Sequence, residues 1–266
     1  MKLIPLGVWV NELPPGGCSS AYLLCSREAN ILIDCGNGAA GQLAHILPLG
    51  DLSAIWISHM HADHFLDIIP VAHTLLSRVR LDMHIRIPLW LPPGGRDILC
   101  QLTSTLGFDD YLFQGGENAK FLKTMEGSTN FLFAVFDVQE YASDLQIKDV
   151  LLSFYEVRHP VRTYAVRASD GHSTFAYSAD TAQCEALHRA ARHADLFLCE
   201  CTEGNSAGQS AIHLSAAQAG DLATQADVKE LVLTHTSAER CEESLSTARM
   251  HFSNTVFAQQ LRPILF

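Results

Sequence analysis

The sequence predicts a layered α/β fold, because short apolar runs typical of strands alternate with segments of helical periodicity. Residues 30–36, 54–58 and 195–200 are compact apolar runs, whereas residues 63–80 repeat apolar positions at helical spacing. The 266 residues are enough to bury one large core. We therefore expect a single domain over residues 1–266.

The first half of the chain begins with strands and then becomes harder to interpret. Strands are expected at 3–10, 21–26, 30–36 and 54–58, with helices near 39–47 and over 63–80. Between about 81 and 150 the pattern is mixed. There only a strand-like run, the loop PPGG and a helix near 95–107 can be assigned.

The second half returns to a regular alternation of strands and helices. Strands are expected at 150–159, 163–169, 173–180, 195–200 and 230–235, with helices near 183–193 and after Ser215. Ser215 and Gln218 have the spacing of a capping box, which predicts a helix start. His213 would then lie just outside that helix N-terminus.

Composition argues against a nucleic-acid-binding protein. The net charge is −11 and the 18 Lys and Arg residues are scattered, so no basic stripe is available for a phosphate backbone. A large RNA such as tRNA is not expected as a partner. A small anionic substrate remains compatible with the charge, because a bound metal ion can invert the local field.

Cysteine usage and hydropathy predict a cytoplasmic protein. The eight cysteines include no CxxC pair and no dense regular spacing, which favours reduced thiols. Cys199 and Cys201 flank Glu200 and should face away from it as buried thiols. Residues 1–10 are expected to form a strand rather than a signal peptide, and no run reaches the roughly 18 apolar residues of a membrane span.

Metal-ligand residue types follow directly after the apolar strands. The stretch WISHMHADHFLD (56–67) contains His59, His61, Asp63 and His64, and later strands are followed or ended by His159, Asp180, Glu200 and His235. In layered α/β folds the ends of strands converge on one site, so these side chains can meet. One metal ion cannot easily accept so many ligands, whereas two neighbouring ions can.

These motifs resemble the metallo-β-lactamase superfamily over nearly the whole chain. The resemblance rests on HMHADH (59–64), RHP with His159, YSADT with Asp180, LTH with His235, and LIDCG (32–36) with Asp34. It implies a four-layer αββα sandwich with the site at one edge of the two sheets.

The resemblance also implies a ligand set for two Zn²⁺ ions. His59, His61 and His159 would hold the first ion, and Asp63, His64 and His235 would hold the second. We also expect Asp63 to be a catalytic residue. Asp180 would bridge the ions, and Asp34 would support the ligands from behind. A bridging water, acidified to hydroxide, would be the nucleophile. Ligand type alone also permits Mn²⁺ or Fe²⁺.

The late motifs are similar to those of ribonuclease Z-like phosphodiesterases. They are ECTEG (200–204), AIHLSAAQAG (211–220) and LTHTS (233–237). By this resemblance His213, 22 residues before His235, is the general acid, and Glu200 orients it. Ribonuclease Z normally inserts a tRNA-binding arm between the ligands that match His159 and Asp180, where this chain has only 20 residues. We therefore expect a small phosphodiester substrate, best matched by a cyclic nucleotide, and a homodimer.

Several alternatives remain open from the residues. The same site could attack the carbonyl of a lactone, thioester or β-lactam, or it could belong to a metal-binding sensor or scaffold without activity. The segment GGCSS (16–20) could offer backbone N–H groups to a phosphate or form a plain turn. Seven further histidines are expected to be ordinary polar residues: His45, His73, His84, His172, His188, His193 and His251.

Overall fold

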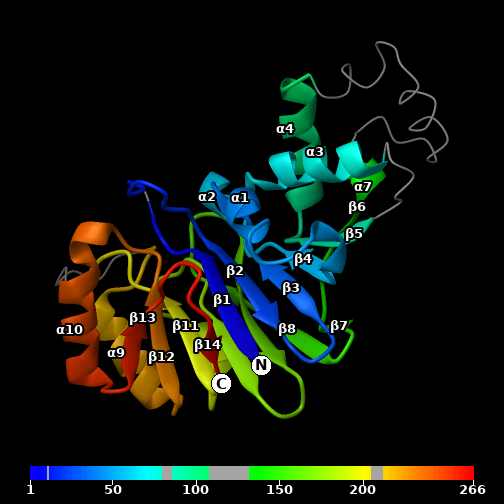
Figure 1. Ribbon diagram of the computed structural model, residues 1–266. Helices are drawn as coiled ribbons and strands as arrows, with labels where there is room; N and C mark the ends of the chain where they lie inside the picture. Colours follow the sequence, from blue (N-terminus) through cyan, green and yellow to red (C-terminus); the bar gives the residue numbers. More distant parts are fainter. Residues whose placement is uncertain (11, 80–85, 108–131, 205–211) are drawn as a thin grey trace.

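A computed structural model describes residues 1–10, 12–79, 86–107, 132–204 and 212–266, and it contains two mixed sheets (Figure 1). In these residues the first sheet has the order β14 (Ile264–Leu265), β1 (Lys2–Gly7), β2 (Ala21–Cys25), β3 (Asn30–Ile33), β4 (Ala54–Trp56), β5 (Ile87–Leu91), β6 (Phe136–Glu140). The second has the order β13 (Thr255–Phe257), β12 (Glu230–Thr234), β11 (Leu196–Glu200), β10 (Thr174–Tyr177), β9 (Thr163–Ser169), β8 (Val150–Val157), β7 (Leu145–Ile147).

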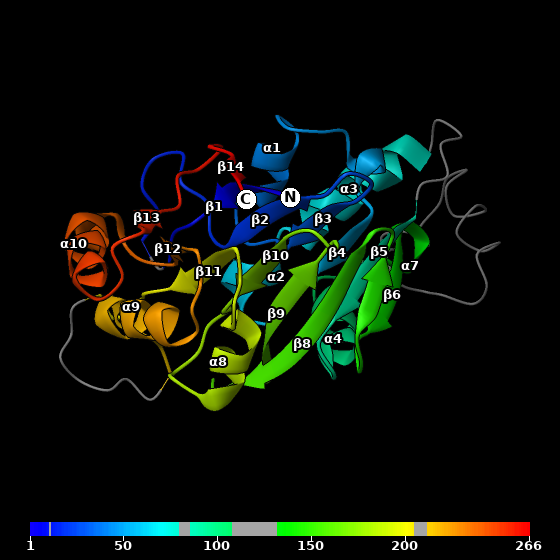
Figure 2. The same cartoon turned by 90° about the horizontal axis from the view of Figure 1, so that it is seen from below.

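Helices cover the outer face of each sheet, which confirms the predicted four-layer αββα sandwich (Figure 2). On the first sheet these are α1 (Ala39–Leu43), α2 (Ala62–Phe65), α3 (Ile68–Val79), α4 (Gly95–Thr105) and α7 (Leu132–Val135). On the second they are α8 (Glu185–Ala191), α9 (Ala216–Gln225) and α10 (Cys241–His251). Among the described residues, no helix is both long and apolar enough to span a bilayer.

The central strands, such as β11, are continuous apolar runs because both of their faces are buried. In β11, Leu196 and Leu198 pack in the core between the sheets, while Phe197 and Cys199 pack against the helices. A strand with only one buried face would instead alternate apolar and polar residues. Cys199 and Cys201 are buried on the helix side, as predicted, and burial raises the pKa of both thiols.

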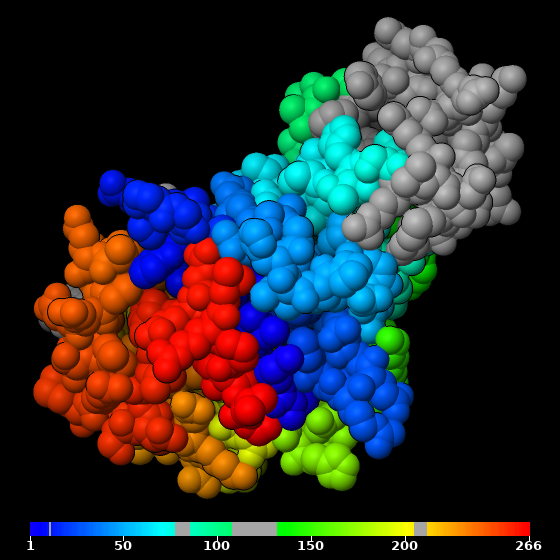
Figure 3. Space-filling model, viewed as in Figure 1, coloured from blue at the N-terminus to red at the C-terminus, as the bar shows by residue number. Residues whose placement is uncertain are grey.

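Parallel pairing brings several strand ends to one edge of the sandwich. In the first sheet β3 to β6 are parallel neighbours, and in the second β10 to β13 are. The carboxyl ends of parallel strands share one edge, so the residues that follow them are brought together. At the other end of the first sheet β14 pairs with β1, so the C-terminal segment (red) lies beside the N-terminal strand (blue) in Figure 3.

Some expected boundaries differ from the structure. The strand expected over 3–10 ends at Gly7, where the register to β2 shifts and a side chain on Gly7 would come within 1.8 Å of the Ser19 carbonyl oxygen. The helical pattern over 63–80 is divided into α2 and α3. In the middle of the chain, β5 and α4 agree with the expected strand-like run and with the helix expected near 95–107, whereas α7, β6 and β7 were not assigned from the sequence. Residues 80–85 and 108–131 lie outside the described residues.

The helix after Ser215 begins as predicted, and it packs tightly on α10. The Ser215 side chain accepts a hydrogen bond from the Gln218 backbone, and the Gln218 side chain accepts one from the Ser215 backbone. One turn further along, a Cβ on Gly220 would lie 2.7 Å from His251 Cβ and 2.8 Å from the Ala248 oxygen. Glycine is therefore required where the two helices meet.

Exchanging two helical glycines for alanine should have opposite effects on stability. Gly220→Ala should lower the free energy of unfolding by about 1–3 kcal/mol, because the added methyl overpacks the α9–α10 contact. Gly41→Ala should raise it by about 0.5–1 kcal/mol, because a Cβ there meets nothing within 4 Å and alanine favours the helix. Denaturant titration followed by circular dichroism measures both, and equal shifts would contradict the packing argument.

Candidate metal centre

The buried carboxylate of Asp34 organises one side of the site. It follows β3 and is fully buried. Its Oδ1 accepts the Ser58 backbone N–H at 2.7 Å, and its Oδ2 accepts the Ser58 hydroxyl at 2.9 Å and the His64 Nδ1–H at 2.8 Å. The Tyr177 hydroxyl, from the second sheet, donates to the same Oδ2 at 2.9 Å. Four donors therefore fix this carboxylate at the junction of the sheets.

The loop after β4 and the helix α2 carry the first four ligand-type residues, His59 and His61 in the loop and Asp63 and His64 in the helix. Backbone bonds hold this segment against the end of β3, from the Cys35 N–H to the His64 oxygen (2.6 Å) and from Asp67 to Cys35 (3.0 Å). Gly36 permits this approach, because a Cβ there would lie 1.9 Å from the Asp63 backbone oxygen. The HxHxDH segment is thus locked onto the strand that supplies Asp34.

The second sheet supplies the other side of the site from its strand ends. His159 follows β8, Asp180 follows β10 and His235 follows β12. Three positions at strand ends have positive φ: Asp34 at 57°, Ala179 at 50° and His235 at 54°. Such backbone costs energy for a residue other than glycine and is typical of functional sites.

Four imidazoles use Nδ1 to bond to the protein and turn Nε2 toward a common centre. His64 donates to Asp34, and His59 Nδ1 donates to the Ser58 hydroxyl at 3.0 Å. The other two are His159, which donates to the Ile212 oxygen at 3.0 Å, and His235, which donates to the Thr202 hydroxyl at 2.8 Å. Such outer hydrogen bonds are typical of metal-ligating histidines, because they fix the tautomer and orient the ring.

Two buried atoms at this centre, one nitrogen and one carboxylate oxygen, lack the hydrogen-bond partners that buried groups normally have. His59 Nε2 and Asp180 Oδ1 are buried without a hydrogen-bond partner. His64 Nε2 lies 3.3 Å from His235 Nε2, and His159 Nε2 lies 3.2 Å from His61 Nδ1. Buried polar groups are rarely left unpaired, and the crowded donor set of nitrogen and carboxylate oxygen atoms fits divalent transition metals.

The predicted ligand residues form two groups that could each hold a metal ion. One is His59, His61, His159 and Asp180, and the other is Asp63, His64 and His235, with ligand atoms within 4.8 Å of one another in each group. A third, overlapping group joins Asp180 and His235 with His213. The structure thus assembles a His/Asp cluster able to bind metal ions; the identity of the metal stays a prediction.

Protonation in the cluster favours metal binding on one side. Burial lowers the pKa of His59 well below its ordinary value, and it lowers those of His61 and His159 as well. These three rings are therefore neutral near pH 7 and keep a nitrogen lone pair for a cation.

Carboxylates control protonation on the other side. Burial opposes the charged form of His64, but Asp180 and Asp34 outweigh it and raise the pKa of His64 well above its ordinary value. Burial also opposes ionisation of Asp63, yet the hydrogen bond to His235 and the nearby His64 lower its pKa to about 2. Without metal, proton charge on His64 balances these carboxylates, so metal binding there should release a proton.

Glu200 and His213 form a hydrogen-bonded pair beside the cluster. Glu200 Oε1 accepts His213 Nδ1–H at 2.9 Å and the Thr181 N–H at 2.7 Å, and Oε2 accepts the Thr202 N–H at 3.2 Å. Burial lowers the pKa of His213, but the hydrogen bond and charge of Glu200 outweigh it, so the pKa lies above its ordinary value. The ring centre of His213 lies 5.2 Å from that of His159.

Three supporting residues were not singled out from the sequence. Ser58 and Tyr177 bind Asp34, and Thr202 accepts His235 Nδ1–H while its own hydroxyl donates to the His235 oxygen. All stand inside or beside quoted motifs: Ser58 precedes HMHADH, Tyr177 opens YSADT, and Thr202 lies in ECTEG. Their position in or next to a ligand motif was the one sequence feature that could have identified them as supporting residues.

Residues outside the cluster follow simpler patterns. The described histidines His45, His73, His172, His188, His193 and His251 are not among the ligand groups of the described residues, and His84 lies outside that part of the chain. In the GGCSS segment, Gly17 N–H donates to Pro14 and Ser19 N–H to Asn37. These N–H groups are used by the backbone, which favours the plain turn.

The geometry of the site agrees with comparisons to known proteins. A family described as "Beta-lactamase superfamily domain" matches residues 29–236, a span that includes all the ligand-type residues of the cluster. The chain belongs to the beta-lactamase superfamily. The predicted family is therefore confirmed, and with it the class of metal-dependent hydrolase.

Several members of the superfamily are similar over nearly the whole chain. A probable metallo-hydrolase, YhfI of Bacillus subtilis (strain 168), is 28% identical over 249 residues, which cover 88% of this chain and 86% of that protein. A ribonuclease Z of Methanosarcina acetivorans is 26% identical over 288 residues, 94% of this chain and 93% of the relative.

Solved structures share the superfamily fold. The crystal structure of YhfI aligns with a TM-score of 0.80 at 23% identity, covering 99% of this chain and 98% of that one. A diphosphatase from the PhnP family aligns with a TM-score of 0.70 at 16% identity, covering 100% and 97%.

Removing the charge of Asp34 should weaken metal binding. Asp34→Asn should lower metal affinity roughly 10–100-fold, because His64 loses its anionic acceptor and the ring its fixed orientation. Competition with a chromogenic chelator measures the affinity. Asp221→Asn is the matched control, since Asp221 accepts from His251 at 2.7 Å on the exposed α9–α10 face. Equal affinities in the two variants would contradict this role of Asp34.

Proposed function

We propose that this protein hydrolyses a phosphodiester bond in a small substrate, best matched by a cyclic nucleotide, with two zinc ions held by the His/Asp cluster. The observation that carries this proposal is the Glu200–His213 pair, whose Nδ1–Oε1 hydrogen bond of 2.9 Å lies beside the ligand groups. Expulsion of an alkoxide requires a proton, and a carboxylate-anchored imidazole is suited to supply it.

The side chains divide the work between binding and proton transfer. His59, His61 and His159 would hold one ion, Asp63, His64 and His235 the other, and Asp180 would contact both. Two such ions, when bound, supply positive charge for the phosphate oxygens and acidify a water molecule. Asp63 is acidic enough to remain ionised toward this site at neutral pH.

His213 is positioned to act through its second ring nitrogen. Glu200 holds Nδ1, so Nε2 is the atom that gives a proton to the departing oxygen. Glu200 is itself fixed by the N–H groups of Thr181 and Thr202. Thr181 follows Asp180 in the chain, and the Thr202 hydroxyl accepts a hydrogen bond from His235. The proposed acid and the ligand-type residues are thus linked by one continuous set of hydrogen bonds.

A phosphodiester is also supported by the names of the relatives and by the shape of the chain. The relatives include a ribonuclease Z and a diphosphatase. Residues 160–179 form a short loop and the β9–β10 hairpin within the second sheet, and contain no arm. Together with the net charge of −11, this favours a small substrate over tRNA.

A substrate panel tests the bond that is cleaved. With zinc restored, the protein should hydrolyse bis(4-nitrophenyl) phosphate and at least one cyclic nucleotide, and chelation should abolish both activities. A panel of lactones and thioesters is run in parallel under the same conditions. Cleavage of carbonyl substrates alone would replace the proposed function by carbonyl hydrolysis, and turnover of neither class would favour a sensor or scaffold.

Replacing His213 should affect substrates according to their leaving group. His213→Ala should lower kcat roughly 10²–10⁴-fold for a diester that expels an alkoxide, such as a cyclic nucleotide. It should lower kcat much less for bis(4-nitrophenyl) phosphate, because 4-nitrophenolate leaves without a proton. Zinc content is measured in the same samples, with His188→Gln as a control outside the cluster. Loss of zinc from His213→Ala would instead make His213 a ligand.

A further inference from the structure

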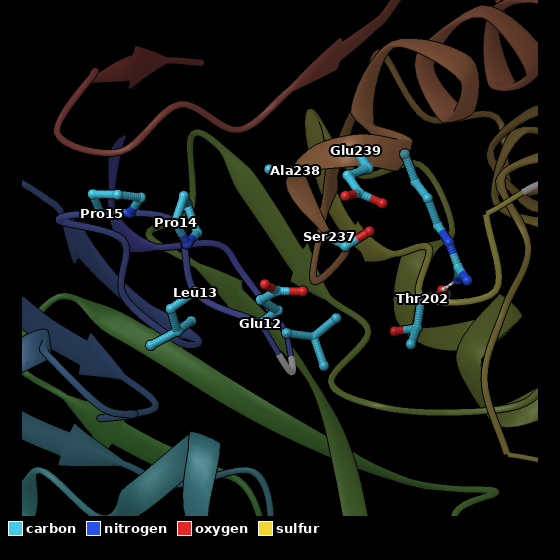
Figure 4. A pocket seen from close by; sticks show the side chains of 10 residues that line it. Glu12, Leu13, Pro14, Pro15, Thr202, Ser237, Ala238 and Glu239 are labelled. Atoms are coloured by element: carbon cyan, nitrogen blue, oxygen red, sulfur yellow. Dashed lines mark hydrogen bonds between the residues drawn. The ribbon is translucent and has the colours of Figure 1, made fainter.

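A pocket of about 400 Å³ lies beside the candidate metal centre, between residues 12–15 and residues 237–240 (Figure 4). Its volume is in the range of small-molecule sites, roughly 300–1,000 Å³. Thr202 lines the pocket and also holds His235 through its hydroxyl at 2.8 Å. One residue therefore both lines the pocket and supports a ligand-type residue of the cluster.

Backbone pairing explains why the pocket opens at this position. The His235 N–H donates to the Val8 oxygen at 2.9 Å, and the Val10 N–H donates to the Thr236 oxygen at 3.4 Å. Beyond this pair the two segments separate into the loops that form the pocket walls. One of these segments carries His235, and Ser237, two residues later, already lines the pocket.

The two walls have different chemistry. Leu13, Pro14 and Pro15 line one side, and Figure 4 shows them across from the side that carries Ser237 and Glu239. An apolar wall opposite hydrogen-bonding groups suits a flat ring with polar edges. An uncharged aromatic or heterocyclic group meets both requirements.

The charges of the pocket oppose an anionic group. Glu12 and Glu239 line it with two carboxylates, against the one guanidinium of Arg240. That guanidinium donates from Nη1 to the Thr202 backbone oxygen at 3.0 Å, so part of its hydrogen-bonding capacity is already used by the wall. A phosphate placed here would meet an excess of negative charge in a partly enclosed space.

We propose that this pocket receives the uncharged ring of the substrate and that Glu12 and Glu239 exclude substrates with a second anionic group there. The inference rests on the proposed phosphodiesterase function and narrows its substrate class to diesters that carry a single negative charge next to a neutral ring. A cyclic mononucleotide satisfies this rule. An oligonucleotide does not, because its chain continues with further phosphates.

The test uses two chromogenic diesters that differ by one phosphate. They are thymidine 5′-(4-nitrophenyl phosphate) and its 3′-phosphorylated derivative, which expel the same leaving group. Methyl 4-nitrophenyl phosphate, which carries no ring for the pocket, serves as the reference. The quantity measured is the ratio of kcat/KM for the first substrate to that for the second, with zinc-replete protein.

Removing the carboxylates should reduce the discrimination. We expect the ratio to be well above one in the unmodified protein and to fall roughly threefold or more in the double variant Glu12→Gln/Glu239→Gln. Raising the salt concentration should also reduce it, because screening weakens repulsion between exposed charges. Glu243→Gln, which removes an exposed carboxylate from α10 outside the pocket, should leave the ratio unchanged.

The outcomes separate this inference from the proposed function. Turnover of none of the three diesters overturns both, because the pocket then has no phosphodiester substrate to select. Turnover with a ratio near one, or with a ratio that the double variant leaves unchanged, overturns the pocket assignment alone. An equal fall in Glu243→Gln also overturns it, because the effect would then come from overall charge.

Discussion

The buried carboxylate of Asp34 is the interaction on which the site depends. A fully buried charge is expensive unless it is paired and hydrogen-bonded, and Asp34 meets both conditions through Ser58, His64 and Tyr177. Ser58 and His64 belong to the ligand segment after β4, whereas Tyr177 ends β10 in the opposite sheet. One side chain therefore joins both sheets to the HxHxDH segment, and any shift between the sheets would be transmitted to the ligands.

The core between the sheets provides the rigidity that this arrangement requires. Beneath the site, the tilted rings of Tyr22 and Tyr177 contact each other with centres 5.2 Å apart, and the Tyr22 hydroxyl lies 2.8 Å from the Thr234 hydroxyl at the end of β12. Positive φ at Asp34 and His235 costs energy that the surrounding packing must offset. The strain lies at the strand ends that present the ligand-type residues, which is where a preorganised site needs a defined direction for each side chain.

The layers and the cluster were predictable from the sequence because each left a local signal. Runs with two buried faces identify β11 and β12, and the ligand-type residues stand directly after strands, where topology concentrates them. The close approaches at Gly7 and Gly36 were not predictable, since they depend on Ser19 and Asp63 from elsewhere in the chain. The same holds for Tyr177 and Thr202, whose partners lie 143 and 33 residues away.

The ligand-type residues and the pocket lie in different parts of this molecule. The ligand-type residues stand at the ends of buried strands, where a displacement would disturb the core, whereas the pocket beside His235 is formed by exposed loop residues such as Glu12 and Glu239. Loops of this kind tolerate substitution without loss of the scaffold. Under the proposed function, a change of charge there would alter which diester is accepted while leaving Asp34 and its donors intact. The shared fold of hydrolases with different substrates follows from this separation, because only the loops have to differ.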